Sequence, residues 1–92
     1  MIPTHRAPTH PGEIILEEFL KPLQMTQTGL ATKMGMHVQQ LNPIINGHRG
    51  VTARTALLLA RTFNTTPEFW MNLQTTYDLW KARQEESRRA SG

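Results

Sequence analysis

An all-α fold of five helices is predicted by this sequence of 92 residues. Apolar residues recur at helical spacings along the chain, and no stretch shows the alternating pattern of a β-strand. Residues suited to begin or end a helix separate these stretches, namely Thr26, Gly35, Gly47, Thr52 and Thr66. The length suits one compact domain and is too short for two independent cores.

The first elements are an arm and a helix. Residues 1–10 carry prolines among polar residues, a composition that favours an extended arm. A first helix begins near Pro11, because the fixed φ of proline suits the first position of a helix. Pro22 stops this helix, since a proline cannot continue the hydrogen-bond ladder. Its apolar residues are Ile14, Ile15, Phe19 and Leu20.

Two short helices follow and together predict a helix-turn-helix over residues 26–46. Leu30 and Ala31 lie where the second helix faces the third, and the small side chain of Ala31 permits close approach of the two backbones. Gly35 supplies the left-handed turn residue, and Leu41 and Ile44 return to the core at helical spacing. An ordinary pair of core helices is the alternative, but the joint fit of these positions favours the motif.

Two further helices complete the fold. The fourth begins at Thr52, after the glycine-rich loop NGHRG, and ends near Asn64. The fifth begins with the start signal Thr66 and Pro67. We expect it to span residues 66–84, where it serves dimerisation, and to be followed by a charged tail over residues 85–92.

The outer side of the third helix is a candidate for reading base edges in the major groove of DNA. Glutamine and asparagine amides donate and accept together, which matches the edge of adenine, and valine suits a thymine methyl group. For each residue the alternative is an ordinary solvated side chain. The base-reading candidates are Val38, Gln39, Gln40 and Asn42.

Phosphate contacts are expected around the start of the second helix, from Lys33 farther along that helix, and just after the third helix. Helix N-termini and hydroxyl groups bind anions, and cationic side chains position the protein without reading sequence. A solvated cation is again the alternative, and Arg54 is a weaker candidate than the others. The phosphate-binding candidates are Thr26, Gln27, Thr28, Lys33 and Arg49.

Pro43 lies inside the proposed recognition helix and conflicts with a regular helix there. It lacks the N–H that would bond the carbonyl of Gln39, and a proline in a helix interior costs about 3 kcal/mol. Either the helix starts late, nearer Gln40, or it kinks. Both outcomes move Gln39 and Asn42 relative to the groove, so DNA binding is weakened or uses an altered set of contacts.

An apolar stripe along the fifth helix predicts a homodimer. Two tryptophans and a tyrosine exceed what so small a core needs, although Phe69 and Leu73 are expected to help close it. A two-fold dimer places two recognition helices about 34 to 36 Å apart and predicts a palindromic operator. The predicted interface residues are Trp70, Leu73, Tyr77 and Trp80.

Composition and residue spacing argue against a metal site, a membrane span and an enzyme. The formal charge of +3 suits nucleic acid without requiring it, and the absence of cysteine excludes thiolate metal sites. No apolar run reaches the roughly 20 residues of a membrane span, and we expect a cytoplasmic protein. The spacing of its histidines matches neither a metal site nor a catalytic constellation, so we predict no enzyme and no cofactor. The four are His5, His10, His37 and His48.

Four segments resemble the HigA-type antitoxins of the Xre, or lambda-repressor-like, helix-turn-helix family. They are THPGEII from residue 9, the helix-turn-helix from Thr26, NGHRGVT from residue 46 and TTPEFWMNLQTTYDLW from Thr65. The resemblance implies an antitoxin that pairs with a HigB-type ribonuclease toxin and represses the operon encoding both. It also assigns base contacts to the outer face of residues 38–42, phosphate contacts to the region of Gln27, and dimerisation to the last helices.

Departures from the family pattern leave two other functions open. His37 and Pro43 stand where polar or basic residues are common, and His48 replaces the usual lysine of its loop. A toxin-binding module with weak or lost DNA binding is one alternative. A free-standing Xre-type transcriptional regulator is the other.

An acidic patch on the first helix is a candidate surface for a basic toxin. The alternative is a solvated helix face, because acidic residues are favourable near a helix N-terminus. The patch consists of Glu13, Glu17 and Glu18.

Overall fold

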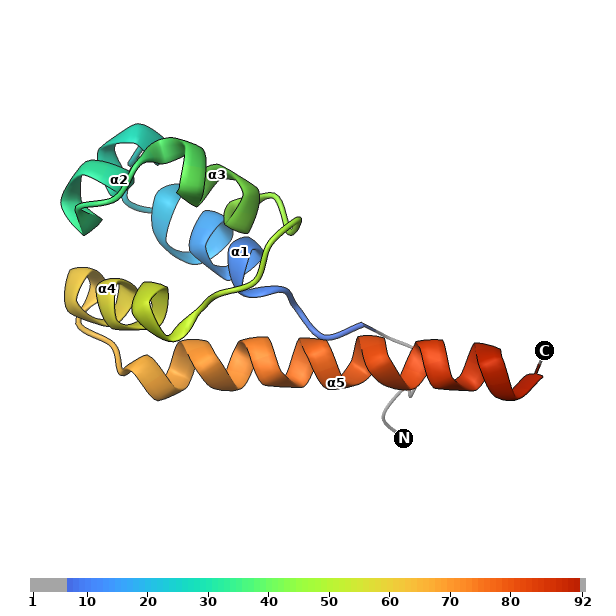
Figure 1. The fold of residues 1–92 in the computed structure, drawn as a ribbon. Coiled ribbons are helices and arrows are strands. Elements are labelled where there is room, and N and C mark those ends of the chain that lie inside the picture. Colours follow the sequence, from blue (N-terminus) through green and yellow to red (C-terminus); the bar gives the residue numbers. More distant parts are fainter. Residues whose placement is uncertain (1–6, 92) are drawn as a thin grey trace.

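The computed structural model describes residues 7–91, and these residues form helices and connecting loops without a strand (Figure 1). The all-α prediction is therefore confirmed. In chain order the elements are α1 (Pro11–Ile14), the π-helix η1 (Ile15–Leu20), α2 (Gln27–Met34), α3 (Val38–Ile45), α4 (Ala53–Phe63) and α5 (Pro67–Ser91).

The first three elements and α3 gather on one side of the domain, and α4 and α5 lie on the other (Figure 1). The N-terminal half of α5 packs along α4, whereas its C-terminal half extends beyond the rest of the domain. One core joins the two sides. Its buried residues are Ile15, Leu20, Leu30, Ala31, Met34, Leu41, Ile44, Ile45, Val51, Ala56, Leu59 and Trp70.

The predicted first helix begins and ends as expected but changes its winding. Pro11 occupies the first turn, and the helix ends at Leu20, before Pro22. Its second half is π-helical, with the amide of Lys21 donating to the carbonyl of Leu16 at 3.0 Å. The predicted first helix is thus present, and its π-helical second half is a feature that the sequence did not indicate.

The residues predicted to begin and end α2 are confirmed. The hydroxyl of Thr26 accepts a hydrogen bond from the amide of Gly29 at 2.9 Å, which satisfies an N–H of the first turn of α2. Gly35 ends α2 with a φ of 73°, a left-handed conformation that glycine adopts without strain. The predicted inward residues Leu30, Ala31 and Leu41 are all buried.

Pro43 lies in the interior of α3 without delaying its start. The amide of Leu41 donates to the carbonyl of His37 at 3.2 Å, so the helix is already formed before Gln40. Of the two alternatives, the late start near Gln40 is therefore wrong, and the kink stays a prediction. The missing proline N–H leaves the carbonyl of Gln39 without its helical donor, but Gln39 is exposed and water can bind there.

The last two helices begin as predicted, and α5 ends later than predicted. Thr52 caps α4 by accepting from the amide of Thr55, and Asn64 ends it with a φ of 56°. The hydroxyl of Thr66 accepts from the amide of Phe69 at 3.2 Å at the start of α5. Residues 85–91, expected to form a tail, continue α5 to its end at Ser91.

Gly12 brings α1 into backbone contact with α3. A Cβ atom at this position would lie 1.9 Å from the carbonyl oxygen of Ile44 and 2.8 Å from that of Ile45. Such distances are far inside van der Waals contact, so only glycine permits this approach. The contact fixes where the C-terminal end of α3 lies.

His10 caps α1 and joins it to α5. Its Nδ1 accepts a hydrogen bond from the amide of Gly12 at 2.9 Å, and its ring meets the ring of Tyr77 edge to face at 4.9 Å. Burial lowers the pKa of His10 below its ordinary value. The neutral ring that this hydrogen bond requires is therefore favoured.

Candidate nucleic-acid interface

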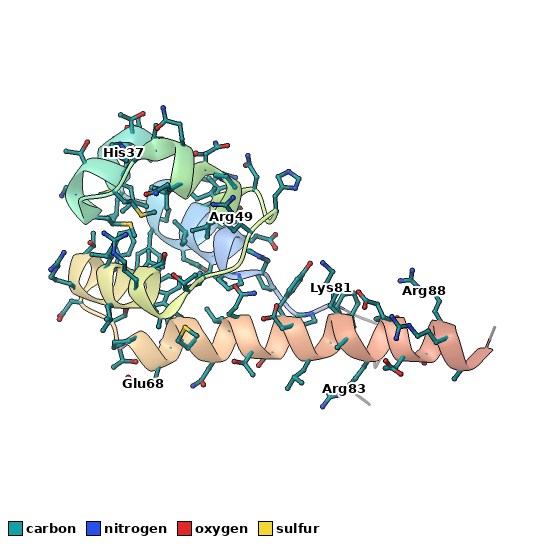
Figure 2. The ribbon with its side chains drawn as sticks, in the orientation of Figure 1. His37, Arg49, Glu68, Lys81, Arg83 and Arg88 are labelled. Carbon is teal, nitrogen blue, oxygen red and sulfur yellow. The ribbon has the colours of Figure 1, made fainter. Side chains whose placement is uncertain are left out.

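The predicted base-reading residues lie on the outer side of α3, with one exception. Gln39, Gln40 and Asn42 are exposed. Val38 is half-buried and packs against the core, so only part of its side chain remains available. Figure 2 labels His37, the residue before this helix, and Arg49, in the loop that follows it.

A chain of amides links the outer sides of α2 and α3. The Nδ2 of Asn42 donates to the Oε1 of Gln27 at 2.8 Å, and the Oδ1 of Asn42 accepts from the Nδ2 of Asn46 at 3.2 Å. Asn42 thus retains one N–H and one lone pair, the combination that adenine requires. Asn42 is held in place and can still read a base.

The start of α2 offers donors for a phosphate. The amides of Gln27 and Thr28 precede the first intrahelical hydrogen bond, which runs from Leu30 to the carbonyl of Thr26. Because the Oε1 of Gln27 is engaged by Asn42, the Nε2 of Gln27 keeps both of its N–H groups for an anion. Backbone and side-chain donors therefore gather at one helix end.

Lys33 is not brought together with these donors. It lies in the last turn of α2 and is exposed. At 1.5 Å of rise per residue, it stands about 9 Å along the axis from Gln27. A phosphate contact by Lys33 would therefore be separate from the one expected at the start of α2, and it stays a prediction.

A polar hollow of about 170 Å³ lies between α3 and α4. Gln40 lines it from α3, Arg49 from the loop and Arg54 from α4, and none of the described residues that line it is acidic. The structure therefore joins Arg49 to a base-reading candidate and adds Arg54, to which the sequence gave less weight. The two cations beside the exposed amide of Gln40 form a site suited to a phosphate group.

Trp70 belongs to the core of the monomer. Its side chain is 0 % exposed, and its Nε1 donates to the hydroxyl of Thr65 at 2.7 Å. This corrects its assignment to a dimer interface. Phe69, expected to help close the core, is instead 42 % exposed.

Of the other predicted interface residues on α5, Leu73 lines a hollow. Leu73, Tyr77 and Trp80 are half-buried. The Nε1 of Trp80 is buried and donates to no acceptor among the described residues. A hollow of about 350 Å³ lies between α5 and the segment before α1, lined by Pro8, Thr9, Ile14, Phe69, Asn72, Leu73 and Thr76.

The acidic patch is exposed and partly neutralised. Glu13, Glu17 and Glu18 all reach solvent from α1 and η1. Glu17 pairs with Lys21 at 2.5 Å, one helical turn further on. This pair fits the solvated-face alternative for Glu17 better than it fits a patch of uniform charge.

The histidines do not gather into a metal site. His10, His37 and His48 stand on three different segments, and no three potential ligands cluster within residues 7–91. His5 lies outside the described residues. Over the same span of the chain, no helix is both long and apolar enough to cross a membrane.

Sequence reasoning missed two residues of this region. Asn46 extends the amide chain of α3, and its position one turn after Asn42 was a usable signal. Gln74 is a buried polar residue of α5, one turn after Trp70 on the inward side of the helix. Nothing local in the sequence reveals its partner, the amide of Val51.

Comparison with known proteins identifies the family. The helix-turn-helix family model matches residues 16–70. Antitoxin HigA-1 of Vibrio cholerae is 44% identical over 89 residues, which cover 92% of this chain and 83% of that protein. An uncharacterized HTH-type transcriptional regulator of Haemophilus influenzae is 47% identical over 75 residues, covering 82% of this chain and 70% of that protein.

Solved structures agree with these relatives. The Pseudomonas aeruginosa antitoxin HigA with the higBA promoter has a TM-score of 0.85 and 36% identity, and covers 90% of each chain. Antitoxin GraA in complex with its operator has a TM-score of 0.84 and 39% identity, covering all of this chain and 93% of the other. A family model that spans more than half of the chain and an antitoxin aligned over nearly all of it show that the chain belongs to the HigA antitoxins of the helix-turn-helix family.

Proposed function

We propose that this protein is an antitoxin that binds the operator of its own operon as a dimer and neutralises a HigB-type ribonuclease toxin. The observation that carries the DNA-binding part is the exposed amide group of α3 beside the cationic hollow of Arg49 and Arg54. Two relatives were solved with promoter or operator DNA, which supports the same function for this chain.

The proposed binding mode places α3 in the major groove. Gln39, Gln40 and Asn42 contact base edges, while the start of α2 and the hollow hold phosphates on either side. Pro43 leaves the start of α3 unchanged, so it does not withdraw Gln39 from the groove by delaying the helix. We therefore favour operator binding over a module that has lost it.

Replacing Asn42 with alanine is expected to lower affinity for the operator roughly 10- to 100-fold relative to random DNA, because a base contact carries about 1–3 kcal/mol of discrimination. Titrations of the DNA upstream of its own gene at several salt concentrations measure this effect. Arg83→Ala is the control, since Arg83 lies on the projecting half of α5, away from α3 (Figure 2). Wild-type protein without salt-sensitive binding would contradict the proposal.

Dimerisation is proposed to use α5. Phe69, Leu73, Thr76 and Trp80 follow one another at spacings of 4, 3 and 4, the repeat of a helix–helix seam. Phe69 remains 42 % exposed, and the hollow beside Leu73 is open to a partner's side chain. With Trp70 removed, the proposed interface keeps Leu73, Tyr77 and Trp80 of the predicted set and adds Phe69.

Trp80→Ala is expected to weaken the dimer by at least about tenfold, because buried aromatic residues carry much of the energy of an interface. Sedimentation across a concentration series measures the monomer–dimer equilibrium. Leu57→Ala is the matched control, since Leu57 is 59 % exposed on α4 rather than α5. Equal dimerisation of the Trp80 variant and the wild type would argue against this surface.

The toxin-binding part of the proposal rests on kinship with HigA-1. The acidic side chains of Glu13 and Glu18 are exposed and attract a basic ribonuclease. In this function the chain performs no reaction of its own and acts in the bacterial cytoplasm, where operator and toxin are found. Co-purification with the product of the adjacent gene tests this part, and a toxin that remains free would contradict it.

A further inference from the structure

Gln74 is a buried polar side chain that lies outside the proposed DNA contacts. It is 7 % exposed, and its Oε1 accepts a hydrogen bond from the amide of Val51 at 2.7 Å. Its Nε2 donates to the Oδ1 of Asp78 at 2.9 Å. Gln74 therefore connects α5 with the loop between α3 and α4.

Asp78 fixes which way the amide of Gln74 points. An ionised carboxylate only accepts hydrogen bonds, so the NH₂ group of Gln74 must face Asp78. The oxygen of the amide then faces the N–H of Val51, which is the one arrangement that satisfies both neighbours. Turning the amide over would place two oxygens together and leave a buried N–H opposite an NH₂ group.

Gly50 permits the close approach of the loop to Gln74. A Cβ atom at Gly50 would lie 2.9 Å from the Nε2 and 3.1 Å from the Oε1 of Gln74. Gly50 does not adopt a positive φ, so an alanine there would disturb this contact without straining its own backbone. The amide cannot retreat freely, because it is bonded at both ends.

The same loop is held from its other end by α3. The carbonyl of Pro43 accepts from the amide of His48 at 2.8 Å and from that of Arg49 at 3.2 Å. Arg49 therefore stands between two anchors, one on the recognition helix and one on α5. From this position its side chain lines the hollow that it shares with Gln40 and Arg54.

We propose that Gln74 is a positioning residue for operator binding, which holds the loop so that Arg49 reaches a phosphate beside the bases read by α3. The inference rests on the proposed DNA-binding function. Gln74 does not touch DNA itself. It acts through Arg49, and it makes the phosphate contact depend on where α5 lies.

Two variants of the full chain test this role. Gln74→Met keeps the length of the side chain and removes both hydrogen bonds, and Gly50→Ala displaces the same amide from the other side. Each is expected to weaken binding to operator and random DNA alike. Each should also reduce the slope of log K against log salt by about one phosphate contact, as Arg49→Ala does.

The double variant Gln74→Met/Arg49→Ala separates positioning from general stability. If Gln74 acts through Arg49, the double variant loses no more of the salt slope than Arg49→Ala alone. Wild-type slopes in both single variants, or additive losses in the double variant, would overturn the inference while leaving wild-type operator binding intact. A wild type that shows no salt-dependent binding would overturn the proposed function as well.

Discussion

Alanine at position 12 is expected to destabilise the protein by about 3 kcal/mol, although alanine is the better helix former. The added methyl group would lie 1.9 Å from the carbonyl oxygen of Ile44 and 2.9 Å from its carbonyl carbon. Both atoms belong to the backbone of α3, so the clash is relieved only if α1 or α3 moves. Urea unfolding measures the loss, and operator titration shows whether the displaced helix still binds.

Gly29→Ala is the control for this prediction. Gly29 lies in α2, and the atom nearest to its added Cβ is the hydroxyl oxygen of Thr26, at 3.1 Å. Alanine also favours helix, so we expect a change in stability within about 1 kcal/mol. A Gly12 variant as stable as the wild type would show that α1 and α3 do not approach as closely as described.

Trp70→Ala is expected to cost about 3–5 kcal/mol, a large part of the 5–15 kcal/mol that stabilises a typical domain. Trp70 is fully buried, lies 5.7 Å from the ring of Phe19 and 5.0 Å from that of Phe69, and bonds Thr65 through its indole. Its removal leaves a cavity between η1 and α5. Thermal unfolding followed by circular dichroism measures the loss.

The two tryptophans should differ in how their effects depend on protein concentration. Trp70→Ala removes core packing within each chain, so its effect on stability should be similar at all concentrations. If Trp80 lies in the proposed interface, the effect of Trp80→Ala should grow where the wild type is dimeric. The reverse pattern would contradict the placement of Trp70 in the core and of Trp80 at the interface.

The helix boundaries were predictable because their signals are local. Thr26, Gly35, Thr52 and Asn64 each act on the turn in which they stand, so neighbouring residues suffice to read them. The end of α5 was missed because its charged residues resemble a solvated tail. Arginine, glutamate and alanine are nevertheless good helix formers, and no proline or glycine interrupts residues 85–91.

The predicted dimer stripe shows what periodicity cannot decide. At 100° per residue, Trp70, Leu73, Tyr77 and Trp80 spread over roughly 80° of the helix surface. The edge of this arc that holds Trp70 faces the core, and the edge that holds Trp80 is only half-buried. The spacing predicts which residues share one side of the helix. It does not predict which of them are buried in the monomer, because the side chains that bury them come from distant parts of the chain.

The outer residues of α3 were predictable because helical periodicity is a local signal. The contacts that position these residues were not predictable. Gln40 and Asn42 follow from the period of one helix. Gln74 and Val51 are 23 residues apart, and Gly12 meets Ile44 from a different helix. Such pairings depend on tertiary packing and leave no local pattern.

In α3, the residues that position the helix differ from the outer residues that are proposed to contact bases. This difference bears on how related antitoxins in one cell come to bind different operators. α3 is held by the backbone contact at Gly12 and by its buried side chains, and neither involves the residues that the helix carries outward. If Gln39 and Gln40 read bases as proposed, substitutions of these exposed residues are expected to change the preferred operator while the domain stays intact. On the proposed function, a duplicated gene would need only a few replacements on this surface, and none in the core, to recognise a different operator.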